Sequence, residues 1–427
     1  MNIGLVTTWF ERGAAYVSRQ YRDELKNGHQ VFIYARGGES CGTGDSNWDV
    51  DNVTWGRQTL NPIPTAIDLP DFRKWLRRNE IALVFFNEQH WWDAVLECRA
   101  AGITVGSYID YYTEQTVPFF NSYDFLVCNT KRHHSVFSWH PQCHYVPWGT
   151  DIDVFKPSTL ALVKPGVVTF FHSGGVSPLR KGCDLVLQAF ARLEGAAELV
   201  LHVQQPLRET MPELAPLINQ LEAQGKLTVI ERSVHAPGLF HLGDVYVYPT
   251  RLEGIGLTVM EATACGLPVI VTDTGPMTEF VEQGVNGAHV QVEKFVARSD
   301  GYYWPQAFVN VVDLAAKMQR FVDAPQSIPP MKSAARNFAL SQLDWRANAR
   351  ILPVLFEQAV RRDDPSIAQT IDRIKLFECR RHELHRLRGY QRLRSTIELR
   401  HPRLFSVASA SWGRVRSAAR SILRRDT

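Results

Sequence analysis

Short apolar runs alternate with stretches of helical periodicity along most of this chain. Residues 2–8 form an apolar run, residues 14–27 have helical spacing and end at Gly28, and residues 30–35 form a second apolar run. A strand, a helix and a strand within about 35 residues predict a βαβ unit. The sequence therefore begins as an α/β fold.

The same alternation continues in two cycles. In the first, strands are predicted at 81–86, 103–109, 125–129 and 144–146, and a helix at 92–101. In the second, strands are predicted at 167–171, 198–203, 227–230, 245–248 and 268–271, and helices at 184–193 and 257–264. Such alternation is typical of parallel sheets covered by helices on both faces. We expect two doubly wound halves joined by residues 151–165, then a proline-rich break at 325–330 and a helical region at 333–361.

Length and composition agree with a folded enzyme-sized chain. The chain has 427 residues, 45% of them hydrophobic and 21% charged, which excludes a disordered or collagen-like protein. Seven scattered cysteines form no C-x-x-C pair, so neither a disulfide framework nor a zinc ribbon is expected, and a reducing compartment fits best. The first residues are predicted to form a strand and not a signal peptide. We expect no membrane-spanning helix, because the sequence has no apolar run of about 18 residues.

The charge is concentrated at one end of the chain. Residues 361–427 hold 17 Lys and Arg but only 7 Asp and Glu. Apolar residues recur there at helical spacing, at Ile367, Ile371, Ile374, Leu384, Leu387 and Ile397. A basic amphipathic helix suits an anionic membrane surface, and packing on the body of the protein is the equal alternative. Nucleic acid is not expected as a partner, because the tail has no recognised motif.

The most informative stretch covers residues 248–270. A predicted strand ends at Pro249, a loop with Gly254 and Gly256 follows, and a helix begins near Leu257. Such a loop lies at the carboxyl end of a parallel strand, where the helix N-terminus can bind phosphate. Glu253 and Glu261 can both face this crevice, where carboxylates accept hydrogen bonds from sugar hydroxyls. An ordinary βα unit with a solvated Glu261 is the alternative.

A second glycine loop precedes a basic helix start. His172-Ser173-Gly174-Gly175 follows a predicted strand, and Arg180-Lys181-Gly182 opens the next helix. A cationic side chain in such a loop can stabilise negative charge on a bound group. A solvated Arg-Lys pair is the alternative.

Together these segments resemble a known family. The pattern P-T-x-x-E-G-x-G-L-x-x-x-E-A-x-A-x-G-x-P-V-I, from Pro249 to Ile270, is similar to the donor site of retaining glycosyltransferases with the GT-B fold, in the large family 4. The resemblance implies two Rossmann-like domains that face a cleft. It implies that Glu253 contacts the donor sugar, that Glu261 holds the ribose hydroxyls, and that Lys181 holds the diphosphate. Further donor-binding residues implied in this way are Gly13, Gly174, Gly175, Arg180, Arg232, Gly254, Gly256, Leu257 and Gly275.

The sequence departs from this family at several positions. Gly175 stands where the family usually has an arginine, and Arg180 is a candidate replacement. Asp110 stands where many relatives have a histidine, and we count it with Glu253 and Lys181 as a catalytic candidate, with helix capping as the alternative. Trp148 replaces the usual asparagine of the link between the domains. The Asp151-x-Asp153 pair falls in that link, so we expect no metal site and no cofactor.

The N-terminal half is expected to bind the acceptor. Glu88 and His90 follow a predicted strand and stand beside two tryptophans, whose faces can pack on sugar rings. Tyr16, on the first helix, is a third candidate. The predicted organisation is an acceptor domain at 1–150, a nucleotide-sugar domain at 151–340, a crossover helix at 341–362 and a basic helical tail at 363–427.

These observations predict a retaining glycosyltransferase that moves a sugar from a nucleotide-diphosphate sugar to an acceptor hydroxyl. The expected partners are the nucleotide sugar, a saccharide or lipid-linked saccharide acceptor, and an anionic membrane surface. The resemblance implies that the protein acts in surface polysaccharide or glycolipid assembly, in the cytoplasm or on the inner face of the membrane. Two alternatives remain at this stage: a non-catalytic nucleotide- or carbohydrate-binding subunit, and a sugar-nucleotide epimerase of the same fold.

Overall fold

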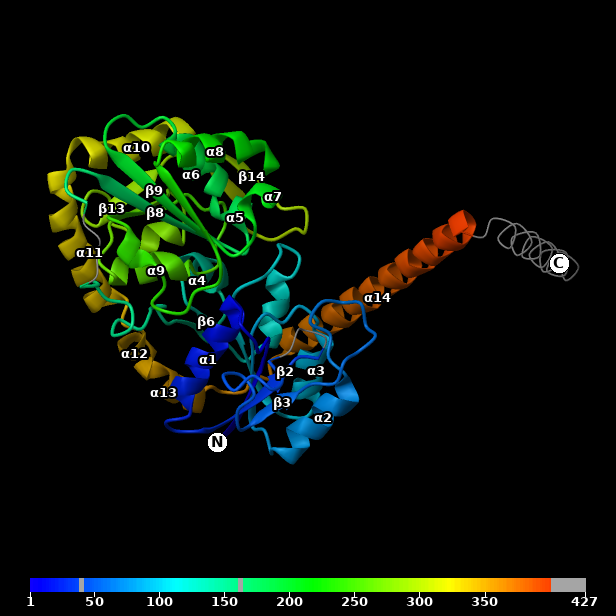
Figure 1. The fold of residues 1–427 in the computed structure, drawn as a ribbon. Helices are drawn as coiled ribbons and strands as arrows, with labels where there is room; N and C mark the ends of the chain where they lie inside the picture. Colours follow the sequence, from blue (N-terminus) through cyan, green and yellow to red (C-terminus); the bar gives the residue numbers. More distant parts are fainter. Residues whose placement is uncertain (38–41, 160–163, 401–427) are drawn as a thin grey trace, which may run out of the picture.

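The computed structural model of the chain describes residues 1–37, 42–159 and 164–400, arranged in two lobes and one long projecting helix (Figure 1). The N-terminal lobe is drawn in blue and cyan, and the C-terminal lobe in green and yellow. The last part of the predicted basic tail, residues 401–427, lies outside the described residues.

A parallel sheet forms the centre of the N-terminal lobe, with the strand order β3-β2-β1-β4-β5-β6-β7. Its middle strands are continuous runs of buried apolar residues, as expected where helices cover both faces. The strands are β1 (Asn2–Thr7), β2 (Gln30–Ala35), β3 (Val53–Trp55), β4 (Leu83–Phe86), β5 (Thr104–Tyr108), β6 (Phe125–Cys128) and β7 (Cys143–Tyr145). The helices are α1 (Gly13–Leu25), α2 (Leu69–Arg78), α3 (Asp93–Ala100) and α4 (Lys131–Phe137).

The C-terminal lobe repeats this winding, with the strand order β10-β9-β8-β11-β12-β13. The strands are β8 (Val168–Gly175), β9 (Ala197–Val203), β10 (Leu227–Glu231), β11 (Val245–Tyr248), β12 (Val269–Thr272) and β13 (Gly287–Val290). The main helices are α5 (Pro178–Lys181), α6 (Cys183–Phe190), α8 (Ala215–Ala223), α9 (Leu257–Ala264) and α10 (Val311–Asp323). The strand order switches sides between the parallel neighbours β8 and β11, so a ligand crevice is expected at their carboxyl ends. The predicted α/β architecture of two Rossmann-like domains is confirmed.

The chain returns from the second lobe to the first through several short helices. Helix α11 (Ile328–Gln342) already begins inside the predicted proline-rich break, because prolines are tolerated in the first turn of a helix. The expected crossover helix is instead broken into α12 (Trp345–Asn348) and α13 (Leu352–Gln358), and α13 contacts α1 (Figure 1).

The link residue Trp148 has a clear packing role in this return. Its ring lies 4.1 Å from that of Trp345 and is almost fully buried. Asp151 and Asp153 both pair with Arg346, at 3.0 and 3.1 Å. The Asp-x-Asp pair therefore ties the link to the returning chain.

A hairpin that the sequence did not reveal spans the two lobes. We call residues 292–309 the strap; they contain β14 (Val292–Val296) and β15 (Gln306–Val309). The strap belongs to the C-terminal domain, but its tip pairs with the N-terminal domain through the bridge between Thr113 and Tyr302. The ring of Tyr302 also stacks on Tyr111 at 5.2 Å.

The long helix α14 (Pro365–Arg400) docks its first turns on the N-terminal domain and then runs away from the body (Figure 1). Ile367 and Ile374 are buried there, and the Glu378 carboxylate accepts a hydrogen bond from the amide of Trp92 at 3.0 Å. The packing alternative therefore holds for this first part, whereas Leu384 is exposed. The side chains of Leu387 and Ile397 lie outside the described part of the structure. Among the described helices, none is long and apolar enough to cross a membrane.

Candidate functional site

A buried charge cluster lies where the sequence analysis expects the donor. The Glu253 carboxylate, on the loop after β11, accepts hydrogen bonds from Lys181 Nζ at 2.7 Å and from Arg180 Nη1 at 3.0 Å. Thr250 and Tyr248 donate to the same oxygen at 2.8 and 3.0 Å. The loops after β8 and β11 therefore meet through one carboxylate, and all three predicted residues come together.

This cluster fixes the charge states of its members. Burial alone would disfavour the Glu253 carboxylate, but Lys181 and Arg180 outweigh that penalty and lower its pKa to about 2. Burial lowers the pKa of Lys181, and Glu253 opposes that shift. The site therefore holds an ionised carboxylate between two cations, with a net charge that suits a phosphate.

A cavity of about 400 Å³ lies between the two domains beside this cluster. Glu261 and Leu257 line it from α9, and Tyr16 lines it from α1, so Tyr16 lies with the donor candidates and not with Glu88 and His90. Burial raises the pKa of Glu261 to about 7, and Lys181 only partly opposes the shift. Other polar residues of the cavity are Glu11, Gln20, Ser173, His202 and Gln204.

Three of the predicted glycines, Gly174, Gly175 and Gly256, occupy positions where a side chain would meet strain or a collision. Gly256 precedes α9 with a φ of 88°, and a Cβ there would collide with Met277. Gly175 has a φ of 52° with open space around it, so its substitution is limited by backbone strain alone. Gly174 packs against Cys183, and Gly13 opens α1. Arg232 differs from these residues, because it is exposed and does not line the cavity.

The acceptor candidates gather at the carboxyl ends of β4 and β5. Burial, with a contribution from Glu88, raises the pKa of Asp110 to about 8. The His90 ring stacks on Tyr111 at 4.4 Å, and burial, assisted by nearby arginines, lowers its pKa to about 4. Below pH 8 Asp110 is therefore a neutral acid, and at neutral pH His90 is a neutral imidazole.

The sequence analysis missed the start of α4, which reaches across the cleft. Arg132 donates to the carbonyl of Gly275 and lies 4.2 Å from the ring of Trp304. Glu279 accepts hydrogen bonds from the amides of Lys131 and Arg132 at 2.7 and 2.9 Å. Glu279 thus caps a helix of the other domain. No local pattern around residue 132 signals these contacts, since their partners lie more than 140 positions away.

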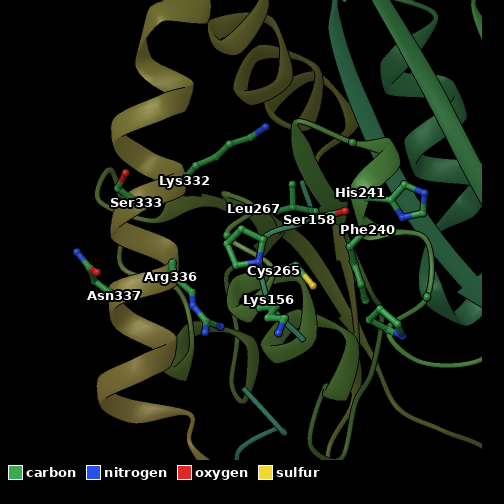
Figure 2. A pocket seen from close by; sticks show the side chains of 15 residues that line it. Lys156, Ser158, Phe240, His241, Cys265, Leu267, Lys332, Ser333, Arg336 and Asn337 are labelled. Atoms are coloured by element: carbon green, nitrogen blue, oxygen red, sulfur yellow. The ribbon is translucent and has the colours of Figure 1, made fainter. Parts of the chain in front are cut away.

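A larger cavity of about 470 Å³ lies behind the link and is not part of this cluster. Helix α11 supplies Lys332, Ser333, Arg336 and Asn337 to its wall (Figure 2). Two of its cations are already engaged, because Lys332 pairs with Asp244 at 2.8 Å and Arg336 donates to the carbonyls of Ile152, Phe155 and Ala264. The volume of this cavity does not by itself indicate a function. In the described residues, no group of three or more His, Cys, Asp or Glu side chains could hold a metal ion.

Comparison with known proteins shows which family the sequence around the cluster resembles. Residues 167–300 match the family described as Glycosyl transferases group 1. The matched stretch contains β8, α9 and every residue of the Glu253 cluster.

Curated relatives of this domain resemble the chain over part of their length. D-inositol 3-phosphate glycosyltransferase of Mycobacterium marinum is 30% identical over 165 residues, which are 36% of this chain and 35% of the relative. The protein of the same name from Mycobacterium tuberculosis (strain F11) is 27% identical over 223 residues, which are 50% of this chain and 43% of the relative. The chain thus spans less than half the length of the curated relatives it matches.

Solved structures match over both domains. Sucrose-phosphate synthase from Thermosynechococcus elongatus has a TM-score of 0.63 at 18% identity, covering 84% of this chain and 98% of that one. HepE from Anabaena, in complex with UDP and glucose, has a TM-score of 0.65 at 16% identity, covering 84% of this chain and 99% of that one. The two-domain body of the chain therefore has the GT-B fold.

Proposed function

We propose that this chain is a retaining glycosyltransferase that transfers a sugar from a nucleotide-diphosphate sugar to an acceptor hydroxyl. The observation that carries the proposal is the Glu253 carboxylate held by Lys181 and Arg180, together with Glu261, which lines the neighbouring cavity and whose charge acts on Lys181. Similarity to glycosyl transferases group 1 and to a neighbour solved with UDP and glucose supports the same donor class.

In this proposal the cavity holds the nucleoside and the cluster holds the diphosphate and sugar. Glu261 accepts hydrogen bonds from the ribose hydroxyls, and Lys181 and Arg180 neutralise the charge that develops on the leaving diphosphate. Glu253 then contacts the donor sugar. The protein contributes positioning and fixed charges and provides no nucleophile of its own.

The acceptor would approach from Glu88, His90 and Asp110. Because the pKa of Asp110 is about 8, its carboxyl group is protonated at neutral pH and donates a hydrogen bond to the acceptor or the sugar. A neutral acid is a poor base, so the leaving diphosphate takes the acceptor proton. Attack from the face that the diphosphate leaves retains the anomeric configuration.

The setting is also a proposal. We place the protein in the cytoplasm, at the inner face of a membrane, with the basic end of α14 on anionic lipid and a saccharide or lipid-linked saccharide as acceptor. Assembly of a surface polysaccharide or glycolipid fits such an acceptor. The proposed reaction needs no metal ion and no cofactor.

Calorimetric binding of UDP, GDP and ADP to the wild type and to Glu261→Ala tests the donor site. We expect one nucleotide to bind and the variant to lose at least about tenfold in affinity, as for loss of a charged hydrogen bond. Release of that nucleotide from its sugar only when an acceptor is present would separate the transferase from an epimerase. Binding without release under any condition would favour a non-catalytic subunit, and no binding at all would contradict the proposal.

A further inference from the structure

A chain of three hydrogen bonds crosses the boundary between the domains twice. Trp304 Nε1, on the strap, donates to the Tyr112 hydroxyl at 2.6 Å. The Tyr112 oxygen lies 2.9 Å from Nδ1 of His133, and Nε2 of His133 lies 3.2 Å from the carbonyl oxygen of Gly254. Trp304 and Gly254 belong to the C-terminal domain, and Tyr112 and His133 belong to the N-terminal domain.

The chemistry of its two ends fixes the direction of this chain. An indole N–H can only donate and a carbonyl oxygen can only accept. Tyr112 therefore accepts from Trp304 and donates its own proton to Nδ1 of His133. The remaining ring nitrogen of His133 then carries the proton that it donates to Gly254.

Burial keeps this arrangement intact. Tyr112 and His133 are 0% and 1% exposed, so water does not compete for their polar atoms. Burial, with the neighbouring Arg132, lowers the pKa of His133 to about 3, so the ring stays neutral and has one donor and one acceptor nitrogen.

Gly254 is the point where this bond has most effect. It follows Glu253 directly and lies two residues before Gly256, which precedes α9. The buried side chains of Glu253 and Ile255 hold the loop on either side of Gly254, whereas a Cβ at Gly254 itself would have no neighbouring atom within 4 Å. The hydrogen bond from His133 therefore adds a restraint on the Gly254 carbonyl, between Glu253 and the amides at the start of α9.

We infer that His133 is a positioning residue that orients the donor loop, and that it does so only while the strap is docked on the N-terminal domain. The inference rests on the proposed donor site, since it names what holds that site in shape. Its consequence is that donor binding and docking of the strap favour one another. Undocking the strap removes the Trp304 bond and frees the Tyr112 oxygen to accept a proton from Nδ1 of His133, and in that tautomer Nε2 has no proton to donate to Gly254.

Two substitutions of His133 by amide side chains distinguish the roles of its two ring nitrogens. In His133→Gln the side-chain amide reaches the place of Nε2, and in His133→Asn it reaches only the place of Nδ1. We expect His133→Gln to bind the nucleotide found among UDP, GDP and ADP within about threefold of wild type. We expect His133→Asn to bind it about tenfold more weakly, as for loss of one buried hydrogen bond. Equal affinity of both variants would overturn the inference.

A second measurement does not depend on nucleotide binding. Nitrogen NMR of the histidines at neutral pH should show the His133 ring protonated on Nε2, and Tyr112→Phe, which removes the donor to Nδ1 but keeps the Gly254 acceptor, should weaken that preference without reversing it. Amide exchange at residues 254–257 should be faster in His133→Asn than in His133→Gln. The opposite tautomer, or unchanged exchange, would contradict the inference even if no nucleotide binds. Absence of nucleotide binding with the expected tautomer and exchange would instead contradict only the proposed function.

Discussion

Lys181 and Glu253 lie 72 positions apart in the sequence, yet Nζ of Lys181 is 2.7 Å from the Glu253 carboxylate. The two side chains are 16% and 9% exposed, so water could not solvate either charge well if its partner were removed. One ion pair thus joins the glycine loop of β8 to that of β11, and the charge of the site depends on both members.

Glu253→Gln tests this pair. The substitution keeps the size of the side chain but leaves Lys181 buried without a counter-charge. We expect kcat to fall by about 10²–10³, as for loss of a single charge-stabilising group, and the free energy of unfolding to fall by about 1–3 kcal/mol. Glu282→Gln, at an exposed residue of the same domain, should leave both unchanged. Steady-state kinetics and denaturant unfolding provide the two readouts, and an unchanged kcat in Glu253→Gln would remove Glu253 from the mechanism.

The pH dependence of stability should reveal Glu261. Its pKa rises from 4.5 to about 7 on folding, so the folded protein binds more protons than the unfolded chain between these values. The Glu261 contribution therefore lowers stability as the pH rises from about 4.5 to 7, and the whole penalty is present above pH 7. Glu261→Gln should remove it, gaining on the order of 2 kcal/mol over wild type at pH 8 and little at pH 4.

Nucleotide affinity should increase as the pH rises, whereas the Glu261 contribution to stability decreases. If the ionised carboxylate accepts the ribose hydroxyls, nucleotide binding should strengthen between pH 6 and 8 in the wild type more than in Glu261→Gln. The variant serves as the control, because the nucleotide itself ionises in the same way with both proteins. Parallel pH profiles for the two proteins would show that Glu261 does not touch the nucleoside.

The sequence predicted the central sheets well because their strands are buried on both faces. Residues 83–86 and 245–248 are apolar at every position, and no turn residue interrupts them. The span of α9 was predicted to the residue, because Gly256 and Gly266 flank it. Lys181 and Glu253 were both identified because the motifs at the ends of those strands resemble a known family, whereas their contact with each other appears only in the structure.

Contacts between the domains could not be predicted in this way. Tyr302 donates to the carbonyl of Asp110 from 192 positions away, and His133 reaches Gly254 across 121 positions. A histidine at the start of a short helix has no local feature that marks such a partner. The strap was missed for the same reason, since its tip is stabilised by the other domain.

Gly175→Arg tests the position where the chain departs from its family. Its φ of 52° penalises any side chain by about 1–2 kcal/mol, but nothing lies within 4 Å to obstruct an arginine. Gly175→Ala carries the same strain without the charge and is the matched control. We expect Gly175→Arg to bind the nucleotide diphosphate several-fold more tightly than Gly175→Ala, because a guanidinium can bond phosphate oxygens in pairs. Equal affinities in calorimetry would show that the loop does not face the diphosphate.

A buried ion pair anchors the return of the chain to the N-terminal domain. Arg99 Nη1 lies 2.8 Å from the Asp124 carboxylate, which also accepts from the amide of Arg362 at 2.8 Å. Asp124 is fully buried, so Asp124→Ala leaves an unpaired buried arginine and should cost about 3–5 kcal/mol of unfolding free energy. Asp153→Ala removes an exposed partner of Arg346 and should cost less than about 1 kcal/mol. Similar losses for both variants in denaturant titrations would contradict the distinction.

Two truncations separate the roles of α14. A chain that ends at Asp364 loses buried Ile367 and Ile374 together with the bond between Glu378 and Trp92, so its melting temperature should fall clearly. A chain that ends at His385 keeps these contacts but loses 11 Lys and Arg and only 2 Asp and Glu. We expect its melting temperature to equal that of the full chain.

The same pair of chains tests the membrane proposal. Each basic group near an anionic surface contributes about 1 kcal/mol to binding. The full chain should therefore sediment with vesicles that contain phosphatidylglycerol and not with phosphatidylcholine vesicles, and the chain ending at His385 should stay in solution with both. Its transfer rate to a water-soluble acceptor should match that of the full chain, because the docked half of α14 is intact. Sedimentation of the shortened chain with anionic vesicles would assign the membrane contact to the two-domain body, and loss of its transfer rate would assign the distal helix to the site itself.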